Sequence, residues 1–263
     1  MRPATSRIGA LLLAASTAAC VVDARAADLS LEQVKATLAR AEPGRPAVFE
    51  GKDLSDMDLS GLDFSHASMG KANLFASRLV NTKFAGADLA GANLNGAWLM
   101  GADFTGAKLG GASLLSVVVL GGEVRKLPVF ERADLRGVRM IADLPGANLA
   151  GADLAGARIG VDIRNQGMGQ MRTDLSGANL ARAKLAKADV SRTLLAFANL
   201  SGCDLRGTNF FRAKLAGANL EGADVSGADF TEADLSGTVL RGAKGLAQAV
   251  GLDRAENLDK AVR

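Results

Sequence analysis

The sequence has no Tyr, one His, one Trp and two Cys among 263 residues, so the residue types that most often carry chemistry are scarce. The lone His66 and two distant cysteines give no zinc-ligand cluster. No glycine loop of the phosphate-binding kind occurs, and the glycine–aspartate nonapeptide of calcium-binding β-rolls is absent. The sequence therefore predicts no catalytic residues, no cofactor and no metal site.

Charge of one sign is also lacking. Lys and Arg number 31 and Asp and Glu number 28, a net charge of +3. Residues 1–26 hold three Arg and one Asp, so the rest has 31 − 3 = 28 bases and 28 − 1 = 27 acids. A surface this close to neutral produces no long-range field toward DNA or an anionic membrane. A nucleic-acid partner is not expected.

The segment 1–26 is typical of a cleaved secretory signal peptide. Arg2 and Arg7 precede an apolar run over 8–22, and Ala24-Arg25-Ala26 has the small-x-small pattern of a cleavage site. The run is too short to span a membrane comfortably. We expect a periplasmic or secreted chain beginning at Ala27, with no transmembrane span. The alternative is a lipoprotein anchored at Cys20.

What the chain has in quantity is one short repeat. The stretch GADLAGANLNGAWLMGADFTG, from Gly86 to Gly106, repeats Ala, then Asp or Asn, then Leu or Phe at every fifth position. Such a step rotates a helix roughly 140° past a full turn, and an odd period puts successive strand side chains on opposite faces. Neither a straight helix nor a straight strand buries this pattern. The chain must bend about once per repeat, as in a solenoid.

This tract resembles the pentapeptide-repeat protein family. The resemblance implies an all-β solenoid, a right-handed quadrilateral β-helix with five residues per side. It also implies that each central Leu or Phe, and the residue two before it, point inward. We expect a capping helix and linker over 27–51, the β-helix over 52–244 with irregular coils at 120–132 and 160–172, and a capping segment over 245–263. The run of central residues from Leu54 to Leu240 then makes about nine coils.

The core and the caps follow from this register. The inward slots hold small residues, so Cys203 is predicted to be core filler. The outward Asp and Asn are predicted to hydrogen-bond the turns. Ser30 to Gln33 has the pattern of a capping box, and Pro43-Gly44 ends the helix that follows. The C-terminal segment, where Leu252, Leu258 and Val262 lie among helix formers, is predicted to cap the last coil as a short helix or to pair two molecules as a homodimer.

Two interruptions and two surface strips are candidates for binding. Trp98 occupies a slot that usually holds Asp or Asn, so it needs apolar cover. We expect Leu127, Val129 and Phe130 to fold back over it from 120–132; the alternative is that a partner covers it. The segment 160–172 is predicted to be a bulge or an adaptable contact loop. The apolar strip comprises Val80, Trp98, Met100, Val118 and Leu120, the loop offers Met168 and Met171, and the basic strip comprises Arg192, Phe211 and Arg212 with Lys184, Lys187 and Lys214 nearby.

These observations predict a non-enzymatic exported scaffold that presents one face of a β-helix to an unidentified protein partner. One alternative is a DNA mimic that binds a topoisomerase, as some members of the resembled family do. That role requires a cytoplasmic chain with a strongly acidic face, and the leader and the neutral charge both oppose it. A structural envelope or self-assembly role is the other alternative.

Overall fold

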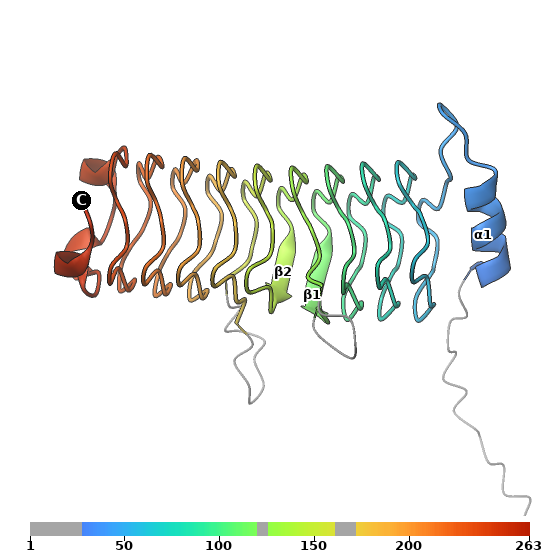
Figure 1. Cartoon of the computed structure of the whole chain (residues 1–263), viewed down its shortest axis with the longest axis horizontal. Coiled ribbons are helices and arrows are strands. Elements are labelled where there is room, and N and C mark those ends of the chain that lie inside the picture. Colours follow the sequence, from blue (N-terminus) through green and yellow to red (C-terminus); the bar gives the residue numbers. More distant parts are fainter. Residues whose placement is uncertain (1–27, 120–125, 161–171) are drawn as a thin grey trace, which may run out of the picture.

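The computed structural model describes residues 28–119, 126–160 and 172–263. It is a rod of stacked coils (Figure 1). Parallel bridges join each ladder residue to one about twenty positions later, as in Asp53 to Asn73 to Asn93, and these bridges form four columns. The predicted all-β solenoid, a four-sided β-helix, is confirmed.

Each side ends in a turn that the outward Asp or Asn stabilises. The Asp88 carboxylate accepts a hydrogen bond from the Ala90 N–H at 3.1 Å, and Gly91 then takes a left-handed conformation with φ +67°. Glycine adopts this conformation without steric cost. The same contact recurs on all four sides, for example at Asp58, Asn93, Asp103 and Asp204. The predicted role of the outward Asp and Asn is confirmed.

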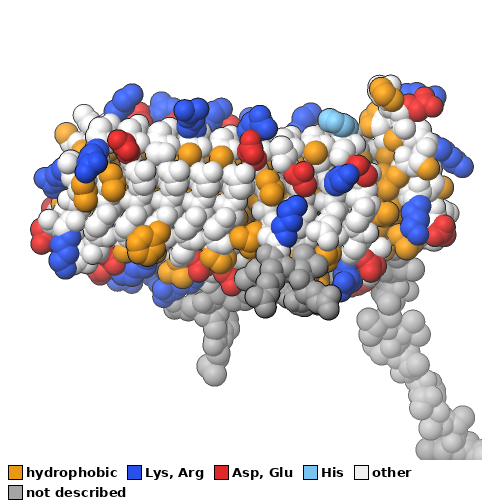
Figure 2. All heavy atoms as spheres, in the orientation of Figure 1, with side chains coloured by type: hydrophobic (Ala, Val, Ile, Leu, Met, Phe, Trp, Pro, Cys, Tyr) orange, Lys and Arg blue, Asp and Glu red, His pale blue; other side chains and the backbone are white. Residues whose placement is uncertain are grey.

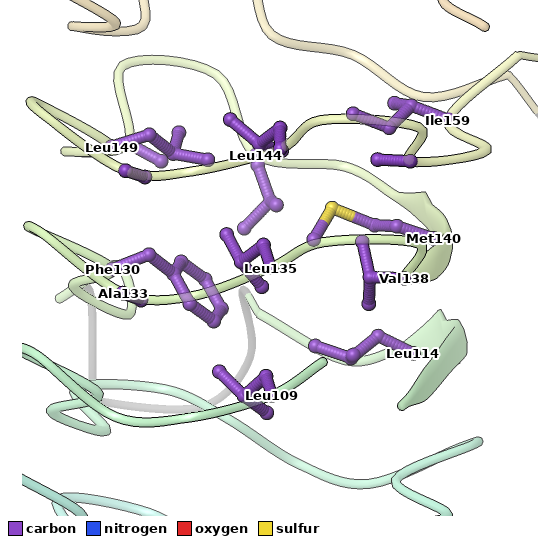
Figure 3. Packing of buried hydrophobic residues seen from close by; sticks show 14 of the residues in the cluster. Leu109, Leu114, Phe130, Ala133, Leu135, Val138, Met140, Leu144, Leu149 and Ile159 are labelled. Atoms are coloured by element: carbon purple, nitrogen blue, oxygen red, sulfur yellow. The ribbon is translucent and has the colours of Figure 1, made fainter. Parts of the chain in front are cut away.

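The core is a set of stacked apolar columns. Phe64, Phe84, Phe104 and Phe130 form one column, with ring centroids 5.4, 4.9 and 5.0 Å apart. Figure 3 shows how central residues from successive coils converge on the axis. The inward slots mostly hold Ala, because neighbouring coils leave no room for more at strand spacing.

Most polar residues in the inward slots donate to a backbone carbonyl; among the described residues the buried Thr193 hydroxyl is an exception with no partner. The Thr82 hydroxyl donates to the Leu59 carbonyl at 3.0 Å, and the Cys203 Sγ lies 3.0 Å from the Leu180 carbonyl. Cys203 is buried, which raises its thiol pKa to about 12. It is core filler, as predicted.

The first interruption differs from the sequence prediction. The separation between Val119 and Leu144 is a multiple of five, which suggested a break that keeps the register throughout. Instead Val119 and Phe130 lie on consecutive sides eleven residues apart, and Met140 and Leu144 only four apart. The ladder resumes at Val129, well before the expected end at 132. The step of eleven residues (an enlarged corner) and the step of four (a shortened side) replace two regular steps of five, so the chain gains five residues in total. This gain equals one repeat, which is why the sequence alone suggested an unbroken register.

The shortened side contains the only extended strand pair in the described residues. Strand β1 (Ser113–Val117) pairs in parallel with β2 (Arg139–Ala142). A bulge falls between Leu115 and Val117, where Ser116 has φ +55°.

The second interruption is simpler. Ile159 and Leu175 lie on consecutive sides sixteen residues apart, so eleven extra residues enter at one corner.

The rod is capped at both ends. Helix α1 (Leu31–Ala39) carries the predicted capping box between Ser30 and Gln33, and it buries Val34 against the first coil. The ladder begins at Val48, which pairs with Ser68, so the β-helix starts four residues before the expected position 52. No helix within the described ranges has the length and apolar character of a membrane span.

The C-terminal cap is a coil with six-residue sides. Three 3-10 helices form its corners: η1 (Leu246–Gln248), η2 (Leu252–Arg254) and η3 (Leu258–Lys260). Val250, Glu256 and Val262 continue the ladder columns. The sequence analysis predicted a cap built from helix formers and apolar residues, and it did not identify the six-residue period.

Candidate functional site

The second side of each coil departs most from the Asp/Asn rule. We define the second side by its ladder column, which is Asp58, Arg78, Trp98, Val118, Asp143, Asp174, Leu194, Lys214, Asp234 and Glu256. The third side is the column that runs from Asp63 to Val262, and the fourth side is the column that runs from Val48 to Lys244. Trp98, Val118 and Leu194 replace the residue that would hydrogen-bond the turn. Large apolar side chains in these outward slots give up the turn hydrogen bond and stay partly exposed, which is typical of recognition surfaces.

Trp98 lies partly open on this side. Its exposed fraction is 37 %, and the Arg78 guanidinium lies over the indole at 5.1 Å from the ring centroid. Arg78 in turn approaches Asp58, with 3.5 Å between Nε and the carboxylate. One indole face is thus covered by a cation and part of the ring remains accessible.

The predicted apolar strip is smaller in the structure than in the sequence. Val80 and Met100 were expected to face solvent, but they are 7 % and 3 % exposed. The chain entering the next side lies alongside, because the Gly101 N–H donates to the Lys126 carbonyl at 2.6 Å. Leu120 lies outside the described residues. Trp98 and the half-buried Val118 remain as the exposed part of the strip.

The expected cover of Trp98 by Leu127, Val129 and Phe130 is wrong. Phe130 is fully buried and stacks on Phe104 in the core. Val129 bridges Asp103 on the third side, and Leu127 packs against the core near Gly146. These residues continue the β-helix instead of folding back, because their spacing fits the register that resumes after the insertion.

A groove on the second side lies next to Val118. It has a volume of about 570 Å³, and Val118, Ile141 and Leu194 form its apolar wall. Asp143, Asp174 and Arg172 supply its charges. We call this the apolar groove. Leu194 and Ile141 were missed in the sequence, although Leu194 breaks the Asp/Asn rule in the same way as Trp98.

A second groove, which we call the basic groove, shares Arg172 with the first. Its volume is about 330 Å³, and it is lined by Arg172, Arg192, Arg212, Lys214, Glu232 and Glu256. The Arg192 and Arg212 guanidinium carbons lie 5.8 and 5.0 Å from the Phe211 ring centroid. The structure therefore brings the predicted trio Arg192, Phe211 and Arg212 together.

Not every predicted neighbour of the basic strip belongs to it. Lys214 lines the basic groove, but Lys184 stands in the fourth-side ladder and approaches Asp153 at 3.5 Å. The Lys187 side chain lies over the corner at Gly207. The twenty-residue period predicts which residues stack on one side of the rod. It does not show that Lys184, on another side, lies away from the basic groove. Met168 and Met171 lie outside the described residues.

The other charged columns neutralise themselves. On the fourth side Arg136 and Arg206 pair with Asp134 and Asp204, and these hydrogen bonds lower the pKa of both carboxyls. The face in Figure 2 shows small mixed groups of acidic and basic side chains and no continuous acidic field. The lone His66 is exposed, with its imidazole beside Gly86. Among the described residues, no group of three or more His, Cys, Asp or Glu is placed to hold a metal ion.

Comparison with known proteins agrees with this architecture. The family model for pentapeptide repeats matches eight copies, over residues 77–114, 173–210 and 208–244. No curated protein sequence matches the chain. The crystal structure of HetL, a pentapeptide repeat protein involved in heterocyst differentiation regulation in the cyanobacterium Nostoc, is similar with 28 % identity and a TM-score of 0.50. That alignment covers 89 % of this chain and 94 % of HetL.

Two further solved structures are similar over part of the rod. Rfr23, a pentapeptide repeat protein from the cyanobacterium Cyanothece, is 29 % identical over 46 % of this chain and 90 % of its own, with a TM-score of 0.25. QnrB1, a plasmid-mediated fluoroquinolone resistance protein, is 19 % identical over 73 % of this chain and 88 % of its own, with a TM-score of 0.28. The repeats and the right-handed quadrilateral β-helix together show that this chain is a pentapeptide-repeat protein.

Proposed function

We propose that this protein is an exported, non-enzymatic scaffold that binds another protein through its second side. The observation that carries the proposal is the apolar groove beside Val118 and Leu194, on a side where Trp98 is also partly exposed. Apolar and aromatic side chains set among charges are common in protein-binding patches.

The solenoid architecture favours recognition by side chains. Along the rod, backbone N–H and C=O groups hydrogen-bond to adjacent coils, as in Leu79 to Trp98 at 2.8 Å. The sides therefore offer no free strand edge to which a partner strand could be added. A partner must contact the ladder residues, and the second side carries the largest apolar ladder side chains, Trp98 and Leu194, beside the apolar groove.

A DNA-mimic role receives no support from the charge distribution. Such a role needs a continuous acidic face, whereas Lys and Arg are interspersed with Asp and Glu along the second-side and fourth-side columns. Export is proposed from residues 1–26 alone. N-terminal sequencing of the mature protein should begin at Ala27. A lipid-modified Cys20 or an uncleaved chain would contradict simple export to the periplasm or medium.

The binding proposal is tested with a matched pair of variants. Leu194 and Asn199 lie on adjacent sides of one coil. We expect Leu194→Asp to abolish recovery of the partner that crosslinks to the native protein, and Asn199→Asp to leave it unchanged. Equal recovery by both variants would show that the second side is not the binding surface.

A further inference from the structure

We propose that Arg192, Phe211 and Arg212 form a carboxylate-binding site that receives an acidic segment of the protein partner. This inference names the partner's chemistry and so rests on the proposed function. It starts from the geometry of the basic groove, where one aromatic ring is contacted by two arginines from consecutive coils.

The stack fixes the arginines without using their hydrogen-bonding edges. Arg192 and Arg212 both lie at corners with left-handed backbone, φ +60° and +57°. A guanidinium packed on a ring contributes its face to that contact, whereas its N–H donors lie in its plane and stay available. Phe211 therefore contacts guanidinium groups from two consecutive coils, whose backbones are about one coil spacing apart, roughly 4.8 Å.

The charges in the basic groove are unequally paired. Arg212 forms an ion pair with Glu232, and Lys214 with Glu256 at 3.1 Å. In the described part of the chain, Arg192 has no carboxylate within ion-pair distance, and its guanidinium packs against Phe211. Arg136 and Arg206 differ, since each is already bound to a neighbouring Asp. Of the two arginines that contact Phe211, Arg192 is thus the one whose guanidinium is ready for an external carboxylate.

The surroundings of the site favour an acidic protein segment over a nucleic acid. Glu232 and Glu256 already pair with Arg212 and Lys214, so the groove lacks the run of unpaired cations that a phosphate chain needs, whereas a single carboxylate needs only one. A protein segment can place one carboxylate at Arg192 and an apolar side chain in the apolar groove, which meets the basic groove at Arg172. Planar carboxylates match the guanidinium fork.

The test uses the full mature chain and a fluorescein-labelled hexaglutamate peptide, with binding followed by fluorescence anisotropy at low salt. We expect Arg192→Gln to weaken binding about tenfold, the loss of one charge-assisted hydrogen-bonded contact. Arg192→Lys should restore only part of the affinity, because lysine keeps the charge but loses the planar fork.

Arg182→Gln is the matched control. Arg182 is an exposed corner arginine with φ +59°, but its side chain lies over Gly202 and contacts no aromatic ring. We expect this variant to bind hexaglutamate as the wild type does. Equal weakening by the Arg182 and Arg192 variants would reduce the effect to general charge and overturn the proposal.

Two other results would also overturn it. One is the absence of hexaglutamate binding, and the other is tighter, Arg192-dependent binding of a labelled oligothymidylate, which would assign the site to nucleic acid. Neither result bears on the capture experiment with Leu194→Asp. Loss of partner capture by that variant would still support the second-side scaffold if the carboxylate site failed.

Discussion

Phe104 and Phe130 stack face to face, with ring centroids 5.0 Å apart and ring planes at 4°, although an insertion separates them in the chain. Regular neighbours such as Phe84 and Phe104, one uninterrupted coil apart, stack at 4.9 Å. The inserted residues enter at a corner and leave the core column intact. Corners lie at the surface, where added chain costs little.

This continuity makes Phe130 a core residue despite its place beside an insertion. We expect Phe130→Ala to lower the free energy of unfolding by about 3–5 kcal/mol, through lost burial and an unfilled cavity. Phe197→Ala is the control, since Phe197 is 75 % exposed, and it should change stability by less than about 0.5 kcal/mol. Equal small effects in guanidinium melts would contradict the alignment of the two coils.

Cys203 should be inert in the folded protein. Burial holds its thiol pKa at about 12, so almost no thiolate exists at neutral pH, and a thiolate is the reactive form. We expect a thiol reagent to label Cys203 only after denaturation. Rapid labelling of the mature native chain would mean that the coil around Leu180 opens readily.

Asp224 should contribute to the acid sensitivity of the fold. Hydrogen bonds from the Ser226 hydroxyl, and then from its N–H, lower the Asp224 pKa. A lowered folded-state pKa gives stability that is present above the unfolded value of about 4 and is lost as pH falls through the folded value. We expect the melting temperature of the wild type to fall relative to Asp224→Asn as pH drops from about 5 to about 3. A constant difference would show that the carboxylate is not favoured in the fold.

Trp98 reports directly on the second side, because it is the only Trp and there is no Tyr. With 37 % of its surface exposed, its fluorescence in the isolated protein should be quenched by iodide. Trp98→Asp should change stability by less than about 0.5 kcal/mol, since Asp58 occupies the same column and holds its own turn. A loss of several kcal/mol, with emission protected from iodide, would show internal cover.

The sequence predicted the β-helix because a period of five has few physical solutions, and it predicted the N-terminal cap because Ser30 and Gln33 act locally. It missed the six-residue coil, although Leu recurs at 246, 252 and 258 and Ala at 249, 255 and 261. The six-residue period is present in the sequence, but the helix formers of this segment pointed to a capping helix.

The candidate site was predicted in part. The repeat register predicted that Trp98, Arg192, Phe211 and Arg212 face outward, because each position within a five-residue repeat has a fixed direction. Val80 and Met100 were misplaced because the repeat register gives the slot of a residue and not how far neighbouring chain covers it; Met100 lies beside the chain at Lys126. The register across 120–132 was misread for a related reason, since the enlarged corner and the shortened side together add one whole repeat.

The most direct test of the account is the sidedness of partner contact. A photoreactive amino acid, p-benzoylphenylalanine, would replace Val118 or Leu194 on the second side, and Asn148 or Asn199 on the third side of neighbouring coils. Irradiation of cells that produce each full-length variant should crosslink one protein of constant mass from the two second-side positions and nothing from the third-side positions. Crosslinks to the same protein from the third side alone, or equally from both sides, would contradict the claim that the second side is the binding surface.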